Sequence, residues 1–255
     1  MSRSAGFRNL IAILGVLTAG AAPLSAADGA VISRASSAPP FILVGFAGGF
    51  IHPDNPHHGP VQLAQRIRKE LPAGAYLQIF ENRHRKTAFK AILNLLDTDH
   101  DGVLSRAEKA RAHIILFGHS WGASAVVLLS RELDRAGVPV LLTVQVDSIA
   151  KPWQSDKMIP ENVAEAANFY QPHGLIHGRS KIRASDNSKT QILGNYRFDY
   201  RKAPVNCEGA SWLEHVLAPS HMQSECDPHL WTQVEALVLQ QMLPQPVMAA
   251  IPQVK

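Results

Sequence analysis

One serine lies in a pattern that could support covalent chemistry. Ser120 stands between two glycines in the run Gly118-His119-Ser120-Trp121-Gly122. A serine hydroxyl is a poor nucleophile at neutral pH, so it needs a base that takes its proton and donors that stabilise the oxyanion formed. The five-residue pattern also occurs by chance, and the elements on either side of it decide whether it has a function.

The flanking sequence predicts that Ser120 sits on a tight turn between a strand and a helix. The apolar residues 113–117 precede the turn, and a helix is predicted from Gly122 to Leu133. The two glycines allow the strand and the helix to approach closely, which a strained nucleophile elbow requires. The segment resembles the elbow of the α/β-hydrolase family, which includes esterases and lipases.

In that family two backbone amides bind the oxyanion, and the resemblance implies which residues supply them here. One amide belongs to the residue after the nucleophile, which is Trp121. The other comes from the turn after the first apolar strand, residues 45–49 (GFAGG), in which Phe46 takes the oxyanion position. The family often has a histidine before that glycine, whereas this chain has Val44, so Ala47 stays an alternative to Phe46.

The family's chain order is nucleophile, acid, histidine, and two aspartates are candidates for the acid. Asp147 directly follows the strongly apolar strand predicted from Val138 to Val146. This places it at the edge of the sheet where the sites of α/β proteins gather. Many family members take the acid one strand later, which points to Asp186. Asp147 is the preferred acid and Asp186 the alternative.

The base must come late in the chain and reach back to Ser120, a position open to His215, His221 and His229. His229 falls in the first turn of the last predicted helix, and His215 lies in an apolar stretch. His221 lies on the loop predicted before that helix, where the family's base belongs, although no clear strand precedes it. We therefore predict that His221 is the base. His119 is expected to be a pocket neighbour, because its place beside Ser120 keeps it from the hydroxyl proton.

Several polar residues follow the oxyanion turn and resemble a set of metal ligands. They are His52, Asp54, His57 and His58. They lack the helical or paired spacing of metal ligands, so we expect them at the rim of the substrate pocket.

A second motif lies in residues 97–108 (DTDHDGVLSRAE), which fit the twelve-residue EF-hand calcium loop at each diagnostic position. The predicted ligands are the carboxylates of Asp97, Asp99 and Asp101, the carbonyl of Val103, a water-mediated contact of Ser105 and the bidentate carboxylate of Glu108. A single loop followed by only about two turns of helix is not a paired sensor. We therefore predict a structural calcium site, and an acidic capped turn without calcium is the alternative.

The order of predicted elements indicates an α/β fold, with a mostly parallel central sheet and helices on both faces. This is the α/β-hydrolase fold that the resemblance implies. Strands are predicted at 41–44, 76–80, 113–117, 138–146 and 166–170, and helices at 60–71, around 89–96, at 122–133 and from 228 onward. The pattern weakens between Lys151 and Ser220, where we expect loops and short elements near the site.

Residues 1–27 have the pattern of a signal peptide, in which Arg3 and Arg8 accompany an apolar stretch too short to span a membrane. A linker (28–40), the hydrolase domain (41–243) and an extended tail (244–255) are predicted to follow, and the mature chain is expected to be secreted or periplasmic. Cleavage would reduce the formal charge from +4 to +2, too mild to imply nucleic-acid binding. Because export permits disulfides, Cys207 and Cys226 are predicted to be bonded.

Two functions fit these patterns. The first is a serine hydrolase that cleaves carboxylic or thio esters through an acyl-enzyme on Ser120, with a small-molecule or lipid ester as its partner. The second is a catalytically inactive, calcium-stabilised binding or scaffold protein on the same fold. Peptidase and acyltransferase chemistry use the same kind of elbow.

Overall fold

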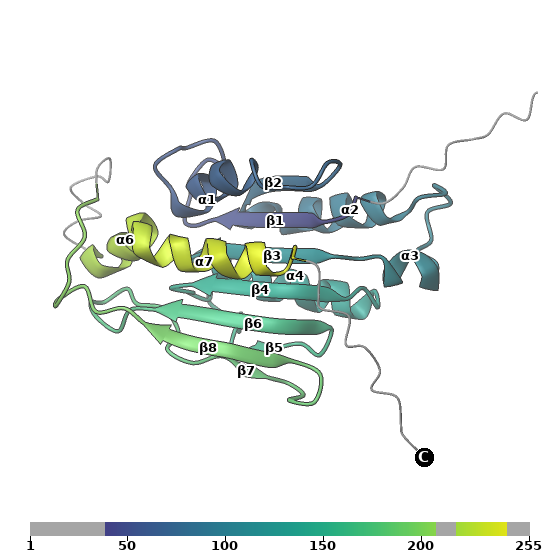
Figure 1. The fold of residues 1–255 in the computed structure, drawn as a ribbon. Helices are drawn as coiled ribbons and strands as arrows, with labels where there is room; N and C mark the ends of the chain where they lie inside the picture. Colours follow the sequence, from purple (N-terminus) through teal and green to yellow (C-terminus); the bar gives the residue numbers. More distant parts are fainter. Residues whose placement is uncertain (1–38, 208–217, 244–255) are drawn as a thin grey trace, which may run out of the picture. The chain divides into compact units, whose positions relative to one another are not determined.

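The computed structural model describes residues 39–207 and 218–243. At its centre lies a six-stranded sheet in the order β2-β1-β3-β4-β6-β8, in which neighbouring strands run parallel (Figure 1). The strands are β1 (Ile42–Ala47), β2 (Tyr76–Glu81), β3 (Ile114–His119), β4 (Val140–Val146), β6 (Val163–Tyr170) and β8 (Gln191–Arg197). A second, two-stranded sheet pairs β5 (Met158–Ile159) with β7 (Arg183–Ala184).

Helices cover both faces of the large sheet. They are α1 (Gly59–Ile67), α2 (Arg85–Leu96), α3 (Arg106–Ala110), α4 (Trp121–Arg135), α6 (Pro219–Cys226) and α7 (Pro228–Gln240), and a 3-10 turn, η1 (Asn82–His84), precedes α2. Helices α1 and α7 pack on one face, and α2 and α4 pack on the other. The parallel sheet between two layers of helices confirms the predicted fold class.

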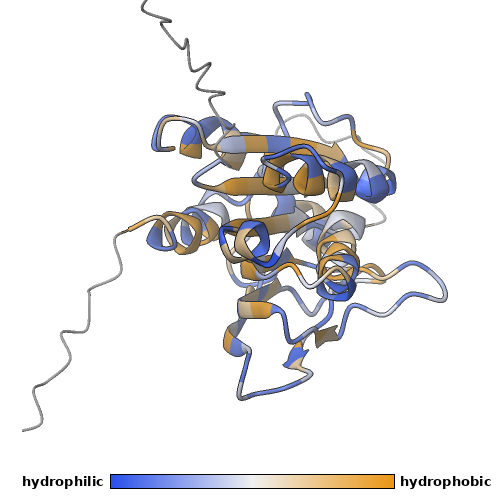
Figure 2. Ribbon diagram, turned by 90° about the vertical axis from the view of Figure 1, so that its right-hand side faces the viewer, coloured by the Kyte–Doolittle hydropathy of each residue, from blue (hydrophilic) through white to orange (hydrophobic). Residues whose placement is uncertain are grey.

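Burial on both faces explains why the central strands are continuously apolar rather than alternating. In β1, Ile42, Val44 and Phe46 belong to the core cluster shared with α2 and α4, whereas Leu43 belongs to the cluster shared with α1 and α7. Figure 2 shows hydrophobic residues concentrated in the strands between the helices. The predicted strands before and after Ser120 are confirmed as β3 and β4.

The prediction of loops and short elements between Lys151 and Ser220 was wrong for β8, the edge strand Gln191–Arg197. Among the described strands this one pairs with β6 alone, and its residues are half-buried or exposed. Its mixed sequence, QILGNYR, therefore lacks the apolar run of a strand buried on both faces. Strand β6 also begins earlier than the predicted residues 166–170.

His221 lies in helix α6 and not on a loop, which corrects a second prediction. The buried residues of α6 are polar: Ser220, His221, Ser224 and Glu225. Because the helix buries this polar face, it has no apolar stripe that would reveal it in the sequence. The strand that the sequence did not show before His221 is β8.

The predicted signal peptide (1–27) and tail (244–255) lie outside the described residues. So does His215, one of the alternatives for the base. In the part of the chain that the structure describes, no helix has the length and apolar character needed to cross a bilayer.

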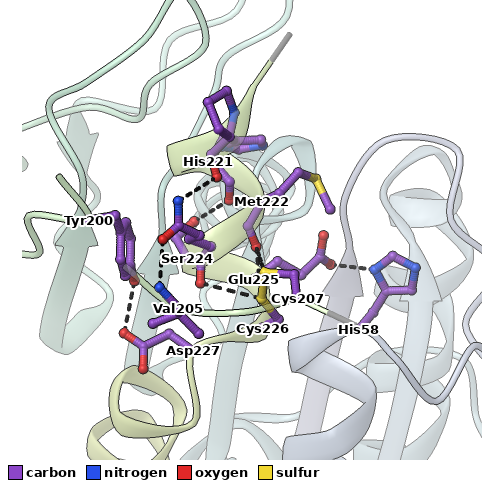
Figure 3. The surroundings of a disulfide bond; sticks show 12 residues. His58, Tyr200, Val205, Cys207, His221, Met222, Ser224, Glu225, Cys226 and Asp227 are labelled. Carbon is purple, nitrogen blue, oxygen red and sulfur yellow. Dashed lines mark hydrogen bonds and ion pairs between the residues drawn. A yellow bond between two sulfur atoms is a disulfide. The ribbon is translucent and has the colours of Figure 1, made fainter. Parts of the chain in front are cut away.

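The predicted disulfide between Cys207 and Cys226 is confirmed, with a Cα–Cα distance of 5.7 Å. It links the chain after β8 to the last residue of α6 (Figure 3). The two cysteines are 19 residues apart, so the bond closes a short loop in the unfolded chain.

Replacing both cysteines, as Cys207→Ser/Cys226→Ser, is expected to lower the free energy of unfolding by about 3 kcal/mol, because the unfolded chain regains the entropy of that loop. Denaturant unfolding under oxidising conditions measures the change. A reducing agent should destabilise the wild type and leave the double variant unaffected. Equal stability of the two oxidised proteins would contradict this expectation.

Candidate active site

Ser120 occupies a tight turn between β3 and α4, at the carboxyl edge of the sheet. Its backbone φ of 56° lies in the left-handed region, which is uncommon for a residue other than glycine. Its amide donates to the carbonyl of Val146 at 2.9 Å, which fixes the turn against the end of β4. A Cβ atom on Gly118 would overlap the backbone of Gly122, and one on Gly122 would overlap the carbonyl of Phe46. The two glycines are therefore required for this close approach.

The structure brings Ser120, His221 and Asp147 together in one hydrogen-bonded row. Nε2 of His221 lies 2.9 Å from Oγ of Ser120, and Nδ1 lies 2.6 Å from Oδ2 of Asp147. All three residues are buried. Because a carboxylate only accepts hydrogen bonds, Nδ1 of His221 carries a proton and Nε2 is free to accept the serine proton.

Asp147 is completely buried at the end of β4 and accepts hydrogen bonds from more than His221. The amide of Gly178 donates to its Oδ1 at 2.6 Å, and the side-chain amide of Gln171 donates to its Oδ2 at 3.0 Å. Gly178 has no room for a side chain, because a Cβ atom there would overlap the carboxylate. These donors hold the carboxylate in one orientation toward His221.

The other candidates for acid and base lie elsewhere. Asp186 lies in the turn between β7 and β8, where its carboxylate accepts from the amide and hydroxyl of Ser188. These hydrogen bonds lower the pKa of Asp186. His229 lies exposed in the first turn of α7, hydrogen-bonded to Gln233. Of the two aspartates, Asp147 is the one hydrogen-bonded to His221.

Two segments next to Ser120, the start of α4 and the turn after β1, are the candidates to supply oxyanion amides. Trp121 is the first residue of α4, so its amide has no acceptor within the helix. The β1–β3 register ends at the pair Phe46 and Gly118, and the chain beyond it turns toward the elbow. A Cβ atom on Gly48 would lie 3.0 Å from Cβ of Ser120, so this turn contacts the serine directly.

The turn after β1 is fixed by Asn82, a buried residue that the sequence reading missed. Its side-chain amide donates to the carbonyl of Gly49 at 2.6 Å, and its Oδ1 accepts from Nζ of Lys151 at 2.6 Å. That ammonium group also lies 4.9 Å from the centre of the Trp121 ring, and the exposed ring of Phe50 packs edge-on against the same indole. The position of Asn82 directly after β2 was the signal available in the sequence.

A cavity of about 500 Å³ opens next to the acid. It is lined by Ser148, Ile149, Ala150, Pro172, His177, Gly178, Arg179 and Ser180. Its walls come from the segments after β4 and β6, so it lies at the same edge of the sheet as Ser120. The amide of Ile149 donates to the carbonyl of Ser120 at 3.3 Å, which joins the cavity wall to the elbow.

The residues predicted at the pocket rim divide into two groups. His52, Asp54 and His57 are exposed in the loop before α1. His58 instead points inward, and its Nδ1 lies 2.7 Å from Oε1 of Glu225 in α6. Glu225 was not identified from the sequence.

Residues 97–108 form an acidic loop between α2 and α3. Carboxylate oxygens of Asp97, Asp99 and Glu108 lie within 4.8 Å of one another. Oδ1 of Asp97 is buried and has no hydrogen-bond partner among the described residues, which fits a site for a cation with oxygen ligands. Both oxygens of Glu108 accept backbone hydrogen bonds, from Ser105 and Thr98, which lower its pKa to about 2.

Hydrogen bonds within the same loop hold the other predicted ligands in place. Oδ2 of Asp97 accepts from the amide of Gly102 at 3.0 Å, and Oδ1 of Asp101 accepts from the amide of Val103 at 2.7 Å. Gly102 has a φ of 80°, which permits the sharp turn. Ser105 caps helix α3, in a capping box with Glu108. The loop lies at the amino end of β3, whereas Ser120 follows its carboxyl end.

No family model and no curated protein matches this chain. Solved structures with a similar chain path include an acetyl xylan esterase, a dienelactone hydrolase from Anabaena variabilis and human thioesterase 2. Their sequence identities are 11%, 12% and 9%, and their TM-scores are 0.39, 0.43 and 0.41. The matches cover 81%, 80% and 80% of this chain and 100%, 86% and 96% of those chains.

His119 lies beneath the row of Ser120, His221 and Asp147 and is 1% exposed. Its ring stacks on that of His221 with centroids 4.7 Å apart, and its Nε2 lies 3.1 Å from Oγ of Ser224. Desolvation by burial lowers the pKa of His119 from 6.5 to about 4. The ring is therefore neutral at pH 7.

Burial of the neutral His119 ring makes the free energy of unfolding depend on pH. As the pH falls through 6.5 the unfolded chain protonates His119, whereas the folded protein does not until about pH 4. Between pH 7 and pH 5 the wild type should therefore lose about 2 kcal/mol more free energy of unfolding than His119→Gln, whose amide does not titrate. Denaturant unfolding at both pH values tests this, and equal losses in the two proteins would refute it.

Proposed function

We propose that the protein is a serine hydrolase that cleaves carboxylic or thio esters. The observation that carries this proposal is the row in which His221 lies 2.9 Å from Ser120 and 2.6 Å from Asp147. A strained serine, an acceptor nitrogen and an orienting carboxylate are the three groups that acyl transfer through an acyl-enzyme requires. The alternative, a scaffold without catalysis, does not need these groups in hydrogen-bonded contact.

The reaction begins when Oγ of Ser120 attacks the carbonyl carbon of the ester and its proton passes to Nε2 of His221. Asp147 stabilises the resulting imidazolium through Nδ1. When the tetrahedral intermediate collapses, the bond to the leaving alcohol or thiol breaks, and His221 returns the proton to that group. Water then attacks the acyl-enzyme by the same route and releases the acid.

The oxyanion is bound by the amide of Trp121 and by an amide at the end of β1, where Phe46 and Ala47 lead into the next turn. The first is supported by the position of Trp121 at the start of α4. The second is supported by the contact between this turn and Ser120 at Gly48. Phe46 is the proposed donor, with Ala47 as its alternative, and Asn82 holds the turn by its hydrogen bond to Gly49.

The substrate is a small-molecule or lipid ester that reaches Ser120 from the carboxyl edge of the sheet. The cavity beside Asp147 is the site for one part of this substrate. We also propose that the chain is exported, and the disulfide supports this because such bonds persist in oxidising compartments.

A fluorophosphonate probe should label the wild type on Ser120 and should not label Ser120→Ala, because the probe reacts with an activated serine. Ser124→Ala, which changes another buried serine in the next turn of α4, is the matched control and should keep labelling. Labelled protein is detected by mass spectrometry. Folded wild type that takes up no probe would favour the scaffold alternative.

We further propose that the loop 97–108 binds calcium and stabilises the fold. The ligands are the oxygens of Asp97, Asp99, Asp101, Val103, Ser105 and Glu108. The unpartnered oxygen of Asp97 and the clustering of three carboxylates support this assignment. Because the loop lies at the opposite end of β3 from Ser120, calcium acts on stability and does not contact the substrate.

Calcium at about one hundred times its dissociation constant is expected to raise the melting temperature by roughly 5–10 °C relative to a chelator. Asp99→Asn should abolish most of this rise, because the amide can keep the hydrogen bond to Asp101 but loses the charge. Asp54→Asn, in an exposed loop, should leave the rise intact. Identical melting curves with calcium and with chelator would eliminate the site.

A further inference from the structure

A second cluster of ionisable groups lies next to His221, on the side of the ring where His119 stacks. Its members are Glu225 in α6, His119 at the end of β3 and His58 before α1. Glu225 is 2% exposed, and the side chain of His58 is 13% exposed. Oε1 of Glu225 lies 2.7 Å from Nδ1 of His58 and 3.6 Å from Nδ1 of His119. Figure 3 shows the pair of His58 and Glu225 beside the disulfide and below His221.

Glu225 is ionised in spite of its burial. Desolvation by burial raises its pKa, but the hydrogen bond from His58, whose Nδ1 lies 2.7 Å from Oε1 of Glu225, opposes this effect, and the pKa is lowered overall. A buried carboxylate without such partners would be strongly destabilising. The proposed reaction uses none of these groups, so their burial needs another explanation.

The hydrogen bonds fix the orientation of His119 between Glu225 and His221. Oγ of Ser224 donates to the carbonyl of His221 at 2.7 Å, so it must accept from Nε2–H of His119. In the neutral ring Nδ1 then has no proton, and it has no hydrogen-bond partner among the described residues. His119 is therefore an uncharged, polarisable ring that separates the carboxylate of Glu225 from the ring of His221.

Helix geometry places the ring of His221 within the electrostatic field of the Glu225 carboxylate. The two residues are four positions apart in α6, so they lie on the same face of the helix, one turn apart. Trp231 in α7 donates its indole N–H to the backbone carbonyl of Glu225 at 2.7 Å and fixes this end of α6. The disulfide at Cys226 fixes the same end.

We propose that Glu225 is a positioning residue of the site, whose buried charge, held by His58, stabilises the imidazolium of His221 across the stacked ring of His119. The proposal rests on the proposed function, because the imidazolium forms when His221 takes the proton of Ser120. Asp147 orients the ring through Nδ1, and Glu225 adds a second negative charge without contact with the substrate.

Other charged and titratable groups also surround His221, and the effect of Glu225 adds to theirs. They are Asp147 at the end of β4, His119 at the end of β3 and Ser120 at the elbow. Asp227, which follows α6, accepts a hydrogen bond from the hydroxyl of Tyr200. Facing Glu225, the ionisable neighbours are His58, His119 and His221.

The decisive variant is Glu225→Gln, which keeps the shape and an acceptor for His58 but removes the charge. Loss of a negative charge near an imidazolium destabilises the protonated ring and so lowers the pKa of His221. When the charge lies one or two helical turns away, the expected decrease is about one pH unit. The acidic limb of kcat/KM for a p-nitrophenyl ester should move to lower pH by the same amount, and kcat should fall roughly threefold to tenfold. Glu225→Asp keeps the charge and should hold the pKa of His221 near the wild-type value.

Glu235→Gln is the matched control. Glu235 in α7 forms an ion pair with Arg66 in α1 at 2.6 Å, away from the site. This variant should leave the pKa of His221 and the pH profile unchanged. If Glu225→Gln lost activity only because of weaker packing, its free energy of unfolding would fall while the pKa of His221 stayed unchanged.

Nuclear magnetic resonance of the His221 ring measures its pKa in each variant whether or not the protein turns over an ester. An unchanged pKa in folded Glu225→Gln overturns the inference. If this variant does not fold, His58→Gln is measured instead. It removes the histidine that holds the buried charge of Glu225 and should lower the pKa of His221, and an unchanged or higher pKa overturns the inference. A wild type that neither hydrolyses esters nor reacts with fluorophosphonate refutes the proposed function alone.

Discussion

The buried carboxylate of Asp147 is the interaction on which the geometry of the site depends. An ionised group with no solvent exposure needs several donors, and here they come from separate parts of the chain: His221 in α6, Gln171 after β6 and Gly178 in the segment that follows. Satisfying this one anion therefore brings α6 and the segment between β6 and β7 to the end of β4. The elbow does not depend on it in the same way, because Ser120 is held by the glycines of its own turn and by Val146.

The sequence was sufficient to predict the parts of the fold that are buried on both faces. Strands β1 and β3 consist mainly of apolar residues, and only Thr143 and Gln145 interrupt the apolar run of β4. The glycines around Ser120 predicted the turn between β3 and α4. Asp147 could be proposed because it directly follows β4. Strand β8 and helix α6 could not be predicted, because one is a half-exposed edge strand and the other buries a polar face.

The residues that hold Asp147 and His58 in place could not be identified from the sequence, for a related reason. Gln171, Gly178 and Glu225 act through contacts between segments far apart in the chain, such as the contact between Gly178 and Asp147, which are 31 positions apart. Periodicity and short motifs report local structure and say nothing about such contacts. His58 illustrates the same point: His57 before it is exposed, yet the side chain of His58 reaches α6. Residue type and local spacing placed it at a pocket rim, whereas its partner Glu225 gives it a different position.

The polar buried face of α6 has a consequence for how the molecule fluctuates. Ser120 and Asp147 are attached to strands in the centre of the sheet, whose amides open only with the whole domain. The buried residues of helix α6 are polar, and the helix is held by side-chain hydrogen bonds and one disulfide, so we expect it to open at a lower free energy than the central strands. We therefore expect the two halves of the hydrogen-bonded row to differ in local stability, with Ser120 and Asp147 held by the sheet and His221 held by the less stable α6.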